Sequence, residues 1–284
     1  MAVLGVRTCI DVVPQCQLSH DLVSQHMRTL LYVAPDRESI LTGYFSEPVL
    51  VQAAAQVTNL ADSNKRWSML LKPLVHCLRN GMVNAGFRGE LVARILLLLA
   101  WDKCFSCMDK LVSGTFLQAI KLKDFLDSLL NLDTEMQATL KTAFDSPDKT
   151  AWVRCTHFVK VDYVPTASQL LALFKRGAAV ISKELQTGVD LVLPVIFCEN
   201  SETILLDSMV SGVFVQVKNR RDGDSGYPGT ATTHLTPMAT GVKISDRLPF
   251  LSLYMSIGAC VKPLIIGWIL RFCMRGLVKG HAGW

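Results

Sequence analysis

Hydrophobic residues along this chain follow two different periods, and each period predicts its own secondary structure. Apolar residues recur every three or four positions over residues 116–132 and 136–144, which predicts two amphipathic helices. Residues 152–161 alternate with a period of two, as residues in a strand do. Thr166 is a typical helix-capping residue, and a helix is expected from there to about Leu185.

Two apolar segments after this helix are predicted to be neighbouring strands. Residues 191–197 are almost continuously apolar, which is typical of a strand covered on both faces. Residues 213–218 alternate instead, so that Gln216 and Lys218 share one face and the valines beside them take the other. Asp190 stands at the head of the first strand, where a buried carboxylate is costly unless it is paired or bound to a metal.

The first 80 residues are predicted to be helical and peripheral. A helix is expected to begin at Glu47-Pro48, because proline is favoured in a first helical turn, and residues 64–66 are expected to break it. Another helix, over residues 90–100, becomes apolar on all sides and should be buried. The predicted division is an N-terminal helical extension (1–80) and an α/β domain (81–284) with a helical insertion (101–150).

Residues 248–270 are apolar enough to support two interpretations. A membrane span needs about 20 apolar residues, and this segment is long enough. A strand over residues 250–256 followed by a short helix from Pro263 fits the same pattern and suits an α/β fold. We prefer the strand and the helix, and a membrane-associated protein is the alternative.

The composition narrows the class of protein. Half of the 284 residues are apolar and 19% are charged, which argues against disorder over most of the length. The formal charge of +5 permits a polyanionic partner without requiring one. The nine cysteines are scattered and odd in number, unlike those of a secreted disulfide scaffold, and no signal-peptide pattern is evident. An intracellular location, nuclear or cytoplasmic, is therefore expected.

An acid at the head of one strand, beside an amide and an ammonium on the next, suits metal-assisted phosphodiester cleavage. Asp190 would bind a divalent cation, Mg²⁺ or Mn²⁺, and the Val217 backbone carbonyl would supply a second ligand. Gln216 is neutral, so it would be a weaker ligand than a carboxylate or would orient water. Lys218 is expected to orient or deprotonate water, or to offset charge in the transition state.

The same two segments resemble a known family. Residues 188–192 (GVDLV) and 215–218 (VQVK) resemble the PD-(D/E)xK superfamily of restriction-endonuclease-like nucleases, in the Mrr-like variant with a QxK motif. The resemblance implies an α/β fold with an αβββαβ core, in which helices flank a mixed sheet. It also implies DNA as the substrate.

That family places a glutamate on its first core helix. Residues 89–94 match this helix loosely, which indicates Glu90 as a catalytic residue and metal ligand. Glu184 competes for the same role, because it lies close to the Asp190 strand in the sequence. Arg220 and Arg221 follow the lysine and are expected to contact phosphate, with a solvated loop as the alternative.

The predicted function is therefore metal-dependent hydrolysis of phosphodiester bonds in DNA. The chief alternative is a catalytically inactive module that keeps the fold and binds nucleic acid or protein, because glutamine replaces an acid. No Gly-x4-Gly-Lys-Ser/Thr loop occurs in the sequence, so no nucleotide cofactor is expected. The prediction leaves open whether the chain forms a homodimer or works with a partner domain.

Overall fold

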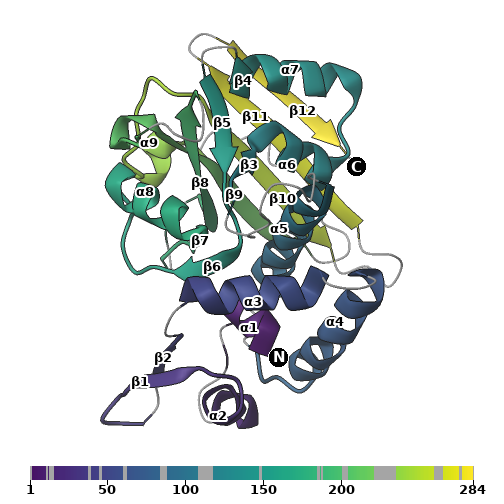
Figure 1. Ribbon diagram of the computed structural model, residues 1–284, viewed down its shortest axis with the longest axis vertical. Helices are drawn as coiled ribbons and strands as arrows, with labels where there is room; N and C mark the ends of the chain where they lie inside the picture. Colours follow the sequence, from purple (N-terminus) through teal and green to yellow (C-terminus); the bar gives the residue numbers. More distant parts are fainter. Residues whose placement is uncertain are drawn as a thin grey trace.

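The computed structural model describes residues 2–10, 12, 16–37, 40–44, 47–59, 63–83, 88–107, 118–146, 149–183, 186, 188–199, 204–220, 235–258, 265–274 and 277–283. Figure 1 shows a large twisted sheet with helices packed on it and a group of N-terminal helices at one end. The chain therefore combines a helical part with a sheet-based part.

The N-terminal part contains helices and one hairpin. Its elements are α1 (Ala2–Thr8), α2 (Gln17–Ser24), β1 (Thr29–Val33), β2 (Ile40–Gly43), α3 (Glu47–Asn59), α4 (Ser63–Arg79) and α5 (Arg88–Cys107). α3 begins at Glu47 with Pro48 in its first turn, as predicted. The prediction that residues 64–66 break a helix is wrong, because polar residues are tolerated in a first turn and α4 begins at Ser63. The hairpin of β1 and β2 was not predicted.

The rest of the chain alternates strands and helices. Its elements are β3 (Ile120–Lys121), α6 (Leu122–Leu130), α7 (Thr134–Phe144), β4 (Asp145–Ser146), β5 (Lys149–Val153), β6 (His157–Lys160), α8 (Ala167–Arg176), β7 (Ala178–Ile181), β8 (Leu191–Cys198), β9 (Val210–Arg220), α9 (Pro237–Thr240), β10 (Phe250–Gly258), β11 (Ile265–Met274) and β12 (Leu277–Gly283).

These strands form one mixed sheet. Within the described residues the order is β12-β11-β10-β9-β8-β5-β3, with β7 beside the start of β8, β6 beside β7 and β4 beside β5. β9 and β10 are parallel, as are β6 and β7, whereas the other pairs are antiparallel. The predicted α/β class, with helices flanking a mixed sheet, is confirmed.

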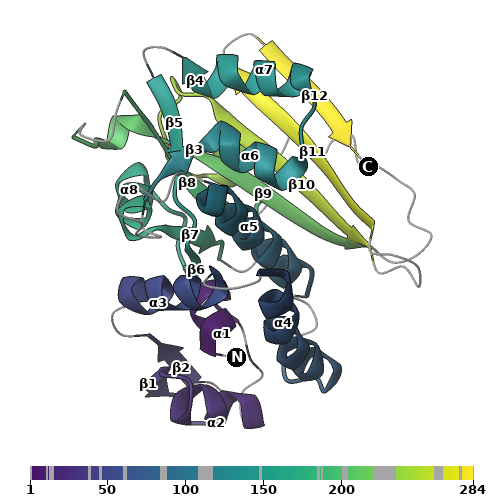
Figure 2. The same ribbon diagram turned by 45° about the vertical axis from the view of Figure 1, so that its right-hand side comes forward.

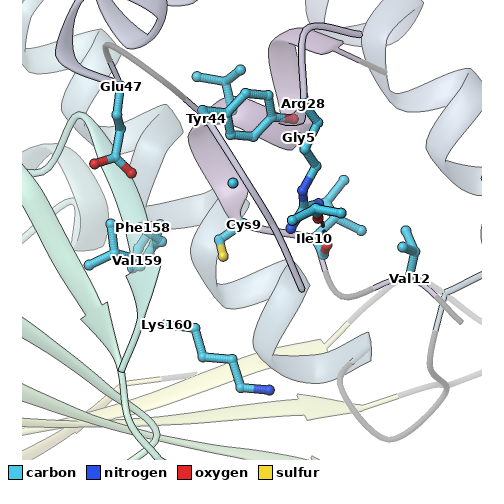
Figure 3. A pocket seen from close by; sticks show the side chains of 13 residues that line it. Gly5, Cys9, Ile10, Val12, Arg28, Tyr44, Glu47, Phe158, Val159 and Lys160 are labelled. Atoms are coloured by element: carbon cyan, nitrogen blue, oxygen red, sulfur yellow. Dashed lines mark hydrogen bonds between the residues drawn. The ribbon is translucent and has the colours of Figure 1, made fainter. Parts of the chain in front are cut away.

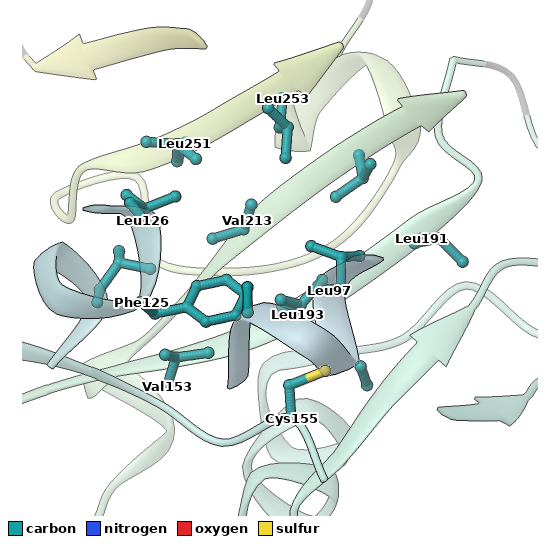
Figure 4. Packing of buried hydrophobic residues seen from close by; sticks show 14 of the residues in the cluster. Leu97, Phe125, Leu126, Val153, Cys155, Leu191, Leu193, Val213, Leu251 and Leu253 are labelled. Atoms are coloured by element: carbon teal, nitrogen blue, oxygen red, sulfur yellow. The ribbon is translucent and has the colours of Figure 1, made fainter. Parts of the chain in front are cut away.

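Helices cover both faces of the central strands. α5, α6 and α7 lie over one face, and α8 lies over the other (Figure 2). The α5-side core includes Leu97, Phe125, Leu193, Val213 and Leu253 (Figure 4). The α8-side core includes Leu170, Phe174, Val192, Ile196 and Phe214. Every residue of β8 is buried, which explains its continuous apolar run.

Three predicted elements differ from the structure. The strand predicted over 152–161 is two strands, β5 and β6, separated by residues 154–156. The helix capped by Thr166 ends early, because Gly177 adopts a left-handed backbone with φ of 75°, and the chain continues as β7. The helix predicted from Pro263 is wrong for the described residues that follow it. They form β11, whose backbone pairs with β10.

The remaining predictions for these regions are partly confirmed. Residues 120–121 of the helix predicted over 116–132 form β3, and residues 122–130 form α6. The strand predicted over 250–256 is confirmed as β10. No helix within the described residues has the length and apolar character that a membrane span requires.

A buried ion pair connects α1 with α5. The two terminal nitrogens of Arg7 donate to the two carboxylate oxygens of Asp102 at 2.8 and 2.7 Å. Arg7 also donates through Nε to the Thr156 carbonyl at 3.1 Å and through Nη1 to Thr58 Oγ1 at 3.2 Å. The division of the chain at residue 80 stays a prediction, but this pair joins the two sides of that division.

Replacing Asp102 with asparagine should strongly destabilise the protein. The Arg7 guanidinium would stay buried without its counter-charge, and breaking one side of such a pair costs about 3–5 kcal/mol. The free energy of unfolding, measured by urea denaturation, should fall by that amount. Asp124→Asn is the control, because its partner Lys123 is partly exposed and the change should stay within about 0.5 kcal/mol. Equal effects in the two variants would contradict the prediction.

Candidate active and metal-binding site

Asp190 lies immediately before β8, at the start of its pairing with β9. Leu191 is paired with Val215 in the antiparallel register. The next residue along β9, Gln216, therefore lies beside Asp190. The strand register thus brings together two residues that are 26 positions apart in the sequence.

The two side chains face the α8 side of the sheet. Val192 and Phe214 belong to the α8-side core, and strand side chains alternate between the faces. Asp190 and Gln216, each two positions from one of these residues, therefore face the same side. Lys218 follows on this face as an exposed side chain near the end of β9.

Hydrogen bonds hold Asp190 in place on both sides. Its backbone N–H donates to the Val215 carbonyl at 2.9 Å, and its carbonyl accepts from the Ser182 N–H at 2.9 Å. Its carboxylate Oδ2 accepts from the Val217 N–H at 2.6 Å. Burial raises the pKa of Asp190, and the Val217 N–H and the positive charge of Lys218 offset only part of this rise. The carboxylate is thus fixed in an environment that disfavours its charge.

A row of polar residues crosses four adjacent strands on this face. Ser182 follows β7, Asp190 precedes β8, Gln216 lies in β9, and Tyr254 lies opposite Gln216 in β10. Two oxygens in the row, Ser182 Oγ and Gln216 Oε1, are shielded from solvent and have no hydrogen-bond partner among the described residues. Unpaired buried oxygens are costly, so an arrangement that keeps two of them calls for a functional explanation.

The donors in this row fit a hard cation in chemical type. A carboxylate, an amide oxygen and a hydroxyl are all oxygen ligands, which Mg²⁺ and Mn²⁺ prefer. Within the described residues, no three His, Cys, Asp or Glu side chains gather into a metal-binding group. Asp190 would therefore be the main charged ligand, and binding would be weak. The backbone carbonyl of Val217 stays a predicted ligand.

The two predicted arginines do not extend the described site. Arg220 is the last residue of β9, but its side chain is outside the described residues. Arg221 lies wholly outside them. Their contact with phosphate stays a prediction.

Glu90 lies on a different side of the sheet from the polar row. It is in the first turn of α5, whose residues Ala93 and Leu97 pack in the α5-side core. Gln216 faces the α8 side instead. The structure therefore does not bring Glu90 into the polar row, and its competitor Glu184 lies outside the described residues.

Sequence reasoning missed two residues of the polar row. Ser182 was assigned to a helix that ends at Gly177 in the structure, so its position at the end of a strand was hidden. Tyr254 could have been found, because residues 251–255 alternate and place Tyr254 opposite the face that carries Leu253. The alternation that places Tyr254 on this face was present in the sequence, but the predicted strand over 250–256 was not aligned with the strand that carries Gln216.

Comparisons with known proteins identify a family without an activity. A family model described as a domain of unknown function (DUF8736) matches residues 1–255. No curated protein matched the chain, and no solved structure did. The match includes all four residues of the polar row and the N-terminal helices, and it ends within β10.

Replacing Asp190 with asparagine should change the free energy of unfolding of the metal-free protein more favourably at neutral pH than at acidic pH. The folded-state pKa of Asp190 is raised, so its contribution to stability is present below the unfolded pKa and is lost as the pH rises through the folded pKa. Asparagine cannot ionise, and its amide oxygen can still accept the Val217 N–H. Urea denaturation with EDTA should show a more favourable variant-minus-wild-type difference at pH 7 than at pH 4.

Asp246→Asn serves as the control, because Asp246 is exposed. Its difference from the wild type should change little between the two pH values. If the Asp190→Asn difference were the same at pH 4 and pH 7, burial would not be what sets the pKa of this carboxyl.

Proposed function

The chain belongs to the DUF8736 family, described as a domain of unknown function, and we propose that it is a metal-dependent nuclease that hydrolyses phosphodiester bonds in DNA. One observation carries the proposal. The amide oxygen of Gln216 is shielded from solvent without a hydrogen-bond partner among the described residues, directly beside the half-buried Asp190. A cation bound between these oxygens would satisfy both of them.

The order of elements around the site supports the proposal. α8, β7, β8, β9, α9 and β10 follow one another in the chain, which is the αβββαβ order of the restriction-endonuclease-like core. β7, β8 and β9 are antiparallel neighbours, and β10 returns parallel to β9. In this arrangement the helix before the three strands is α8, and its ten residues include no acid. The position of Glu90 on α5 therefore does not match that of the first core helix.

The proposed chemistry divides the work among the residues of the row. Asp190 and Gln216 would hold a divalent cation, which lowers the pKa of bound water and so supplies a nucleophile at neutral pH. The Val217 N–H fixes the Asp190 carboxylate by donating to its Oδ2 oxygen. The other oxygen, Oδ1, would bind the cation. Lys218, exposed at the end of the strand, would offset the charge that develops on the phosphate oxygens.

A second candidate function is a binding module that has lost cleavage. The observation that favours it is the single carboxylate of the row, since Gln216 is neutral and α8 carries no acid. Such a module would retain DNA without cutting it. The cleavage assay below separates the two candidates.

Cleavage of supercoiled plasmid should require Mg²⁺ or Mn²⁺ and should stop with EDTA. Asp190→Asn and Lys218→Met should each reduce the rate by about 100-fold or more, as loss of a charged group at a reacting phosphate does. Lys141→Met is the matched control, because this exposed lysine lies on α7, on the opposite face of the sheet. Cleavage that survives both site substitutions would rule out this site.

Gln216→Glu tests the role of the amide oxygen directly. The substitution adds a second carboxylate beside Asp190, so less Mg²⁺ should be needed for the same rise in melting temperature. Binding of DNA without cleavage in the wild type and in Gln216→Glu would favour the binding module. An unchanged Mg²⁺ response would mean that Gln216 does not face a cation.

A further inference from the structure

A cavity lies between α1, the β1–β2 hairpin and β6, and none of the residues that line it belongs to the polar row. Its volume is about 470 Å³, within the range of small-molecule sites. Figure 3 shows Tyr44 and Arg28 next to each other on one side of it, and Phe158, Val159 and Lys160 along another. The cavity thus combines polar groups with an apolar wall.

Two hydrogen-bond donors in this cavity have no partner among the described residues. They are the Tyr44 hydroxyl and the Arg28 Nε, and both atoms are shielded from solvent. The Arg28 guanidinium lies 5.6 Å from the centre of the Tyr44 ring, so the two groups are close together. Burial raises the pKa of Tyr44, so its hydroxyl stays protonated at neutral pH. Both groups can therefore donate a hydrogen bond to an acceptor on a bound ligand.

Gly5 leaves room for the Tyr44 hydroxyl, and a hydrogen bond positions Arg28. A Cβ atom at Gly5 of α1 would lie 2.8 Å from the Tyr44 hydroxyl oxygen, so the absence of a side chain there lets the hydroxyl approach the helix. The Arg28 side chain is anchored by a hydrogen bond from its Nη1 to the Ile10 carbonyl at 3.3 Å. Each unpaired buried donor costs roughly 1–3 kcal/mol, a cost that a bound acceptor would remove.

The carboxylate of Glu47, which lines this cavity, already has positively charged or hydrogen-bonding partners. Glu47 pairs with Arg176, and its Oε1 lies 3.4 Å from His157 Nε2. Burial alone would raise the pKa of Glu47, but His157 and Arg176 outweigh it, and the pKa is lowered. Because Glu47 is held by these partners, it does not compete for the donors of Arg28 and Tyr44.

We propose that this cavity binds a small organic anion, with its carboxylate or phosphate oxygens on Arg28 and Tyr44. An apolar body of the ligand would lie against Val6, Phe158 and Val159. A cationic ligand is disfavoured, because the Arg28 guanidinium would repel it and the Tyr44 hydroxyl is a donor. A purely apolar ligand is disfavoured because it would leave both donors unpaired. The proposal is independent of the nuclease site, because no residue is shared between the two.

The test is calorimetric titration of the full chain with phenyl phosphate, benzoate and the neutral benzyl alcohol. At least one anion should bind, benzyl alcohol should not, and the better anion identifies the headgroup. Tyr44→Phe removes only the hydroxyl and should weaken binding roughly tenfold or more. Arg28→Gln should weaken it at least as much, whereas binding by Tyr163→Phe and Arg247→Gln should be unchanged, because these two exposed residues lie elsewhere.

Three outcomes would overturn the proposal: no binding of either anion, equal binding of benzyl alcohol, or full binding by Tyr44→Phe. Arg28→Gln also removes the contact with the Tyr44 ring, so its folding must be checked by circular dichroism. If that variant unfolds, Tyr44→Phe decides the matter alone. None of these results depends on cleavage of DNA.

Discussion

The pairing of β8 with β9 is the constraint on which the rest of the structure depends. β8 is buried along its whole length, so each of its side chains must enter one of two packed cores. Its register with β9 decides which side chain enters which core, and a shift by one residue would exchange the two faces. The polar row exists because this register places Asp190, Gln216 and Lys218 on the same side, at the point where the ladder begins.

The stability of the protein rests on apolar packing. The buried charged pair of Arg7 and Asp102 is tolerated because hydrogen bonds satisfy both side chains. Arg7 and Asp102 satisfy each other, and Thr58 and Thr156 complete the set of partners around the guanidinium. The unpaired oxygens of Ser182 and Gln216 contrast with this arrangement, as do the unpaired donors of the cavity between α1, the β1–β2 hairpin and β6. The paired groups around Arg7 stabilise the fold, whereas the unpaired groups of the polar row and of the cavity are the basis of our two ligand proposals.

The sequence predicted those elements whose pattern is local. The apolar run of β8, the alternation of β9 and the proline at the start of α3 each carry their signal within a few residues. The end of α8 was missed because one glycine outweighed a helical pattern that continued beyond it. The strand β11 was missed because its partner β10 supplies the pairing, and a single segment does not show its partner. The polar row needed both kinds of information: Asp190 and Gln216 came from motifs, whereas finding Ser182 required the true end of α8 and finding Tyr254 required the register of β10 with β9.

The ion pair between α1 and α5 has a consequence for how the chain is made. Arg7 is separated from Asp102 by 95 positions and from Thr156 by 149, so its partners leave the ribosome long after α1 does. Until then, the Arg7 guanidinium has no counter-charge, so burying it is unfavourable and α1 is expected to stay exposed to solvent. Contacts this distant in sequence close slowly, so we expect α1 to reach its final position late in folding.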